Sequence, residues 1–325
     1  IPGKVRKLHI CASTTLDSVS RSIPRWPAQK GSVRDKDATA GCFARRHDVQ
    51  SAILGLGNGM LTGNARRARP MSRIHIAKTS TTTSDYAAER SDLAAAFRWA
   101  ARLNMHEGVA NHFSVAVNDD GTQFLMNPNQ SHFSRIRASD LILVDANDPE
   151  TMARPDAPDP TAWGLHGALH RQCAHARVAL HVHSIHATIL STLEDPRLPP
   201  IDQNCAMFFN RYAIDTEYGG LAFEEEAERC CRHLADPAKK VLIMCQHGVM
   251  VIGDDVADAF NRLFYFERAA KTYVKALWTG QPLRVLSDEV AEKTACELDN
   301  YPGQAERHFA ELKAILNVEE PDYNT

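Results

Sequence analysis

Residues 178–190 read VALHVHSIHATIL and place three histidines in an otherwise apolar run. The first half predicts a strand, and the second half continues as an apolar helix. Along a strand successive side chains alternate between faces, so His181 and His183 point to the same side, one pleat apart. That spacing suits two imidazoles on one zinc ion, each at roughly 2.0–2.1 Å. An HxH pair alone is more often a pair of hydrogen-bonded core histidines, so further ligands must be sought elsewhere in the chain.

A third histidine stands at the end of another predicted strand. The run VLIMCQ predicts a buried strand that ends at His247-Gly248, and VMVIG predicts the strand that follows. Glycine lets the backbone approach a neighbouring group closely. Histidines from neighbouring strand ends would complete the three-histidine set of a catalytic zinc site, which keeps one coordination position open. His186 lies at the start of the helical stretch, and we interpret it as structural.

Helices and strands interleave along the rest of the chain, which predicts one mixed α/β domain over residues 75–318. The chain has 325 residues, 44% of them hydrophobic and 24% charged, as is usual for globular proteins. An amphipathic helix is expected over 85–104, further helix over 287–317, and a loose tail after it. The longest apolar runs are too short to cross a membrane. The eight cysteines form no CxxC pair and favour a reducing, cytoplasmic environment.

Residues 1–70 differ in composition from everything that follows. They carry 13 lysines and arginines against four aspartates and no glutamate, whereas residues 71–325 are acidic overall. Three interpretations remain open: an arginine-rich targeting peptide, a basic arm for nucleic acid, or sequence upstream of a natural start at Met71. The composition shows no consistent pattern across the segment, which favours the third interpretation, a natural start at Met71. We therefore expect a basic leader that is disordered or not native to the protein, and assign it no function.

Four motifs, in this order, resemble the class II aldolase/adducin head family, and in particular its adducin-like bacterial branch. They are LNMHEGVANHFSVAV, W-x-x-H-x-A-x-H-R, ALHVHSIHAT and LIMCQHGVMVIG, and the resemblance covers about residues 85–280. It implies a three-layer α/β/α sandwich around a mainly antiparallel central sheet. It also implies that Zn²⁺ is held by His181, His183 and His247, which raises the metal interpretation above the core interpretation. A homo-tetramer is implied as well.

The chain departs from the sugar-phosphate aldolases of that family at the positions that carry their chemistry. The acid that ligates the metal and exchanges the substrate proton corresponds to Ala162, and the tyrosine on the leaving aldehyde would fall near Gln203. The three stretches that bind phosphate correspond here to Asn111-His112, Asn129-Gln130 and Pro160-Thr161. Their glycine amides and small hydroxyls, which suit a phosphate, are largely gone. The resemblance therefore weakens the standard sugar-phosphate aldolase interpretation.

One histidine is placed to replace the missing acid. His166 lies one helical turn beyond Ala162 and so faces the same side of its predicted helix. It is the candidate catalytic residue, as a general base near neutral pH or as a fourth metal ligand. The alternative is that His166 and His170 only pack or hydrogen-bond on the helix.

Two functions compete. The first is a zinc-dependent lyase, aldolase-like or decarboxylating, that acts on a small hydroxy-carbonyl compound lacking a terminal phosphate. The second is a non-catalytic adducin-like binding or assembly module in which the metal is structural or absent. Retention of all three metal histidines favours the first, and Ala162 favours the second. We expect neither a membrane nor a nucleic-acid partner, because only the charge of residues 1–70 points to nucleic acid and the acidic body opposes it.

Overall fold

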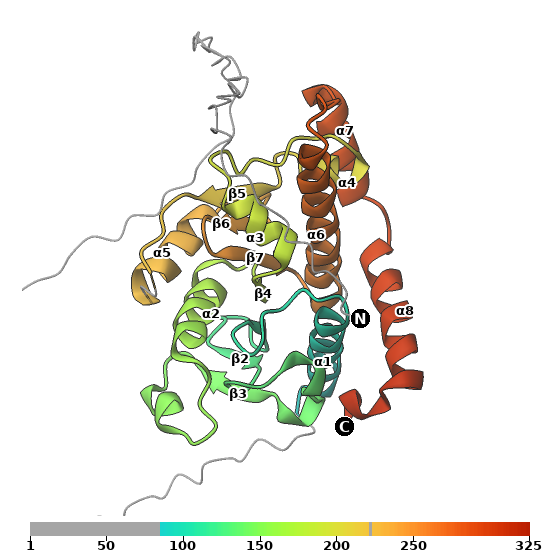
Figure 1. Cartoon of the computed structure of the whole chain (residues 1–325). Helices are drawn as coiled ribbons and strands as arrows, with labels where there is room; N and C mark the ends of the chain where they lie inside the picture. Colours follow the sequence, from blue (N-terminus) through green and yellow to red (C-terminus); the bar gives the residue numbers. More distant parts are fainter. Residues whose placement is uncertain (1–84, 221–222) are drawn as a thin grey trace, which may run out of the picture. The chain divides into compact units, whose positions relative to one another are not determined.

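A seven-stranded sheet forms the centre of this computed structural model, which describes residues 85–220 and 223–325 (Figure 1). The strand order is β3-β2-β1-β4-β7-β6-β5, and every neighbouring pair is antiparallel except β5 and β6. The strands are β1 His112–Ala116, β2 Gln123–Met126, β3 Ile142–Asp145, β4 Val178–Val182, β5 Tyr212–Asp215, β6 Val241–Met244 and β7 Gly248–Gly253. The expected mainly antiparallel sheet is confirmed.

Helices cover both faces of this sheet and complete the three-layer sandwich that the sequence predicted (Figure 1). The helices α1, α3 and α6 pack on one face, and α2 and α5 pack on the other. The α-helices are α1 Ala87–Arg102, α2 Pro160–Gln172, α3 Ile185–Ser191, α4 Gln203–Met207, α5 Phe223–His233, α6 Val256–Trp278, α7 Asp288–Asp299 and α8 Gln304–Glu319. Short 3-10 helices are η1 Phe133–Arg135, η2 Ala138–Asp140, η3 Pro149–Ala153 and η4 Pro321–Asn324.

The alternation of side chains along β4 determines which helices its histidine faces. Leu180 and Val182 of β4 belong to the core under α1 and α6, whereas Ala179 belongs to the core under α2 and α5. Because the side-chain period of a strand is two residues, His181 shares the face of Ala179. The fold therefore turns His181 toward the layer made by α2 and α5.

Three features differ from the sequence-based expectations. The strand β5 was not expected, and the stretch 287–317 forms two helices separated by Gly303, whose φ of 66° is left-handed. The chain end is not a loose tail, because Tyr323 is fully buried and the Ser139 N–H donates to the Thr325 carbonyl at 2.8 Å.

Residues 1–70 and the start of the expected domain at residue 75 lie outside the described residues. Within the described ranges, no helix is both long and apolar enough to cross a membrane.

Candidate metal centre

His181, His183 and His247 converge on the sheet side covered by α2 and α5. His181 and His183 come from the end of β4, and His247 comes from the turn between β6 and β7. One potential ligand nitrogen from each ring lies within 4.8 Å of the other two, and His181 Nε2 and His183 Nε2 are 3.0 Å apart. In a tetrahedral zinc site two bound nitrogens lie roughly 3.3 Å apart, given bonds of about 2.0–2.1 Å. The three rings are thus spaced to bind one ion.

The second nitrogen of each ring is held by an acceptor from the protein. The Nδ1–H of His181 donates to the Val249 carbonyl at 3.1 Å. The Nδ1–H of His183 donates to Glu107, and that of His247 donates to the carboxylate of Glu226 at 3.0 Å. Carboxylate and carbonyl acceptors of this kind fix the tautomer of metal-binding histidines. Because Nδ1 carries the proton in each ring, the lone pair on Nε2 is free to bind a metal.

Burial favours the neutral form of His181 and His183, which is the form that binds a metal. Burial lowers the pKa of His181 well below its usual value, and the neighbouring His112 and His183 lower it further. Burial also lowers the pKa of His183, although the hydrogen bond to Glu107 opposes this shift. The donor set and its spacing therefore fit zinc.

Gly248 lets β7 begin close to the metal histidines, as the sequence predicted. A Cβ atom at this position would lie 2.5 Å from the Val182 carbonyl oxygen and 2.9 Å from Cδ2 of the His183 ring. Both distances are shorter than van der Waals contact, and the first involves backbone. A larger residue at position 248 must therefore displace either β4 or the His183 ring.

We expect Gly248→Ala to weaken zinc binding by about 10-fold or more, because a shift of His183 disturbs a ligand without removing it. Competition with a chromophoric chelator measures this affinity. Gly164→Ala is the matched control, since a Cβ there meets nothing within 4 Å. Equal affinities of the two variants would contradict the close-approach argument.

Glu226 is a second feature that can be tested separately from the ligands. We expect Glu226→Gln to lower zinc affinity by about 10-fold, because the glutamine amide oxygen can still accept from the His247 Nδ1–H but lacks the negative charge that raises the basicity of the ligand nitrogen. The matched control is Glu225→Gln, because Glu225 is the preceding residue on α5 and is exposed. If both variants bind zinc as the wild type does, Glu226 does not support His247.

His112 lies between His166 and the metal histidine His181. His112 pairs with His181 across β1 and β4, and the two rings stack with centroids 4.8 Å apart. His166 Nε2 lies 2.7 Å from His112 Nδ1, and His166 Nδ1 is hydrogen-bonded to Ser114 Oγ. Both ring nitrogens of His166 are therefore occupied by protein groups. Its assignment as general base or fourth ligand stays a prediction.

A small cavity lies beside His112. Its volume is about 10 Å³, close to the space of one ordered water molecule. Ala162 of α2 lines it and is fully buried, so the position of the family's missing acid faces this space. Asn111 and Asp159 line it too, and the described lining residues include no lysine or arginine.

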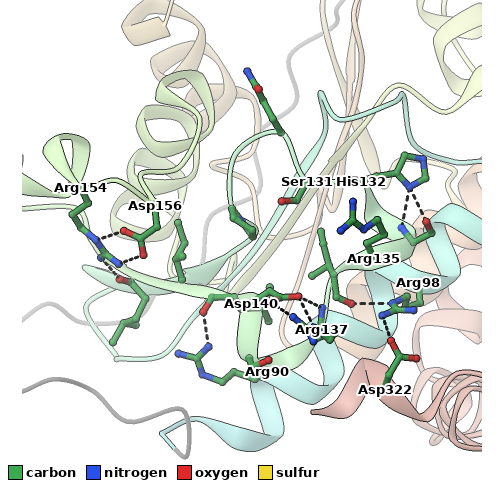
Figure 2. A pocket seen from close by; sticks show the side chains of 18 residues that line it. Arg90, Arg98, Ser131, His132, Arg135, Arg137, Asp140, Arg154, Asp156 and Asp322 are labelled. Atoms are coloured by element: carbon green, nitrogen blue, oxygen red, sulfur yellow. Dashed lines mark hydrogen bonds and ion pairs between the residues drawn. The ribbon is translucent and has the colours of Figure 1, made fainter.

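A larger cavity of about 860 Å³ lies apart from the three histidines (Figure 2). Five arginines line it, but most of them are already bonded within the protein: Arg98 to Asp322 at 2.8 Å, Arg137 to Asp140 at 3.0 Å and Arg154 to Asp156 at 2.6 Å. Arg90 donates to backbone carbonyls. Most of the arginine charge therefore stabilises the fold, and we assign this cavity no ligand.

Sequence reasoning missed Glu107, Glu226 and Ser114. Glu107 lies inside a motif that was recognised, but nothing in its spacing pairs it with His183. Glu226 belongs to a run of three glutamates, which the sequence explains equally well as the acidic first turn of a helix. Only the packing of α5 against the sheet singles out one of the three.

Known proteins resemble this chain over the same region. The family model for the class II aldolase and adducin N-terminal domain matches residues 91–274. The crystal structure of an aldolase II superfamily protein from Pseudomonas syringae is 29% identical, with a TM-score of 0.67 over 75% of this chain and 98% of that one. Decarboxylase NovR of Streptomyces niveus is 25% identical over 210 residues, which are 64% of this chain and 76% of NovR. An L-fuculose 1-phosphate aldolase from Glaciozyma antarctica PI12 shares the fold, with 21% identity and a TM-score of 0.62 over 76% of this chain and 96% of that one.

Proposed function

The chain belongs to the class II aldolase and adducin N-terminal domain family, and from this premise we propose that it is a zinc-dependent carbon–carbon lyase. The substrate we propose is a small hydroxy-carbonyl compound without a terminal phosphate. The observation that carries the proposal is the histidine cluster: three imidazoles converge through Nε2 while each Nδ1 is held by a carboxylate or carbonyl. Such a set serves a catalytic zinc site that keeps a position open for substrate.

His181, His183 and His247 would hold the ion, which would act as a Lewis acid on carbonyl and hydroxyl oxygens of the substrate. The protein's own contribution is to orient these rings. Glu107 and Glu226 each hold one imidazole by its Nδ1–H and add negative charge behind it. This arrangement raises the basicity of the ligand nitrogens and keeps the rings from turning.

His166 is proposed to influence proton transfer through His112. A proton from the substrate can reach His166 only along the hydrogen bond between the two rings, because Ser114 occupies the other nitrogen. Burial lowers the pKa of His166 well below its usual value, and the neighbouring His112 and His170 lower it further. His166 therefore favours the neutral form and a role that depends on hydrogen bonding.

The small cavity supports a substrate without phosphate. Its described lining offers no cationic side chain that could bind a phosphate group. The similarity to a protein named decarboxylase NovR supports a second variant of the same chemistry, in which the carbon–carbon bond broken releases carbon dioxide.

The alternative proposal is an adducin-like binding or assembly module. The full burial of Ala162, where the family's aldolases place their acid, favours this alternative. It predicts that metal removal changes stability or assembly and that no small hydroxy-carbonyl compound is consumed.

The deciding experiment is metal analysis of protein purified without chelator, followed by screening of small hydroxy-carbonyl compounds. We expect about one zinc per chain and turnover that stops with a chelator and returns with zinc. Zinc-loaded protein that turns over none of these compounds, while losing self-association with a chelator, would support the alternative.

We also propose that the protein is a homo-oligomer and specifically a tetramer. Large apolar side chains are exposed at the end of α6 and after α7, where Trp278 is 71% and Tyr301 59% exposed. Trp278 and Tyr301 are the side chains that we propose to lie in the contact between subunits. Light scattering at micromolar concentration tests this, and a monomer mass would contradict it.

A further inference from the structure

A continuous chain of hydrogen bonds runs from His112, which lines the small cavity, into the core. His112 Nδ1 and His166 Nε2 are 2.7 Å apart, and His166 Nδ1 is bonded to Ser114 Oγ. Ser114 Oγ lies 2.7 Å from His170 Nε2, and His170 Nδ1 lies 2.7 Å from the Ala176 carbonyl oxygen. All four side chains are buried. The proposed mechanism uses only the first of these bonds.

The last bond fixes the direction of every other one. A carbonyl oxygen can only accept, so His170 carries its proton on Nδ1, and its Nε2 must accept from the Ser114 hydroxyl. That hydroxyl has one proton, so Ser114 Oγ accepts the next bond, from His166 Nδ1. A neutral His166 then accepts on Nε2, and His112 donates from Nδ1. His112 is thereby left with a bare lone pair on Nε2.

These bond directions hold for neutral imidazoles, and burial of the side chains favours the neutral form. Burial lowers the pKa of His170, at the far end of the chain of bonds, to about 4. No carboxylate takes part in the chain, so nothing within it compensates a buried positive charge.

Asn111, the residue before His112, supplies a hydrogen-bond donor that complements the acceptor at His112 Nε2. Asn111 Oδ1 accepts from the backbone N–H groups of Glu107 and His183, at 2.7 and 3.3 Å, which fixes the orientation of the amide. Its Nδ2 is buried without a hydrogen-bond partner among residues 85–220 and 223–325. Asn111 and His112 both line the small cavity. Asp159 lines it too, but Asp159 Oδ1 already accepts from the Thr161 N–H at 2.9 Å.

We propose that Ser114, His166 and His170 are positioning residues that hold the proton of His112 on Nδ1. His112 Nε2 and Asn111 Nδ2 then bind one hydroxyl group of the substrate, which donates to the first and accepts from the second. A carboxylate fits worse, because at neutral pH its oxygens have no proton to donate to Nε2. The assignment of this hydroxyl to a substrate rests on the proposed lyase function, whereas the tautomer of His112 does not.

The tautomer is tested by solid-state ¹⁵N NMR of zinc-loaded protein labelled with ¹⁵N-histidine, since the two ring nitrogens differ in shift according to which one carries the proton. The His112 signals are assigned by their loss in His112→Asn. We expect a protonated Nδ1 and a bare Nε2 in the wild type. A proton on Nε2, directed at Asp159, would overturn the proposal whether or not the protein is an enzyme.

The recognised group is tested with hydroxyacetone and methoxyacetone, which differ only in whether the hydroxyl proton is replaced by a methyl group. We expect hydroxyacetone to shift the His112 Nε2 signal and to bind about 10-fold or more tightly, since methoxyacetone leaves a buried acceptor unpaired. Equal binding of hydroxyacetone and methoxyacetone would overturn the hydroxyl assignment.

The positioning role is tested with Ser114→Ala, and Ser114→Thr restores the hydroxyl. In Ser114→Ala the Nδ1–H of His166 loses its acceptor, so His166 is free to reverse its bond to His112. We expect a signal from protonated His112 Nε2 to appear in the alanine variant and to be absent in the threonine variant. An unchanged His112 tautomer in folded Ser114→Ala would show that the chain does not set it. A wild type with the expected tautomer but no turnover would refute the lyase proposal alone.

Discussion

Replacing His183 by alanine is expected to lower zinc affinity by more than about 100-fold, a larger effect than the loss of an acceptor behind a ligand. His181→Ala should do the same. Each change removes one of the three nitrogens that lie within 4.8 Å of one another, and two imidazoles cannot complete the site. The measurement is zinc content after dialysis against a weak chelator, together with competition titration.

His132→Ala is the control for this experiment. His132 is exposed and forms a hydrogen-bonded pair with His106, so it tests whether a histidine pair elsewhere retains zinc. We expect wild-type zinc content in this variant. Unchanged zinc content in both His181→Ala and His183→Ala would refute the site itself.

The unfolding free energy should fall by about 2 kcal/mol on account of His170 alone when the pH drops from about 7 to about 4.5. The pKa of His170 is about 4 in the folded protein because the ring is buried, against about 6.5 in an unfolded chain. At a pH between these two pKa values, His170 is protonated in the unfolded state and neutral in the folded state. The stability is therefore fully present above pH 6.5 and is lost as the pH falls toward 4.

His170→Asn removes this titration and keeps an amide donor near the Ala176 carbonyl. Urea unfolding at both pH values, with a chelator present so that metal release does not contribute, should show a smaller loss for this variant than for the wild type. His132→Asn, which removes an exposed ring, should lose as much as the wild type does. Identical pH dependence of His170→Asn and the wild type would mean that His170 is solvated in the folded state.

The sequence predicted the sheet strands around the histidines because those strands are apolar and bounded by turns. It could not predict β5, since YAID is short and its face is only half-buried. The break between α7 and α8 lies at Pro302-Gly303, a local turn signal that the expectation of helix over 287–317 did not use. Only β5 therefore depends on packing between segments that are distant in the chain.

In the candidate site, too, some features follow from local sequence and others from the pairing of distant segments. The HxH spacing and the strand-end His247-Gly248 are local features, and the structure brings these histidines together. The helical relation of Ala162 and His166 was also local, but it could not show that His112 would stand between His166 and the ligands. That position follows from the register of β1 against β4, which pairs His112 with His181.

The burial of Tyr323, two residues before Thr325, has a practical consequence for protein engineering. Tyr323 is enclosed by the fold, the Thr325 carbonyl is hydrogen-bonded to the Ser139 backbone, and Arg98 is paired with Asp322. A purification tag or reporter fused directly after Thr325 would pull on this anchored end, and trimming the last residues would strip a mostly buried guanidinium of a partner. Fusions at this terminus need a flexible spacer that leaves the final turn seated.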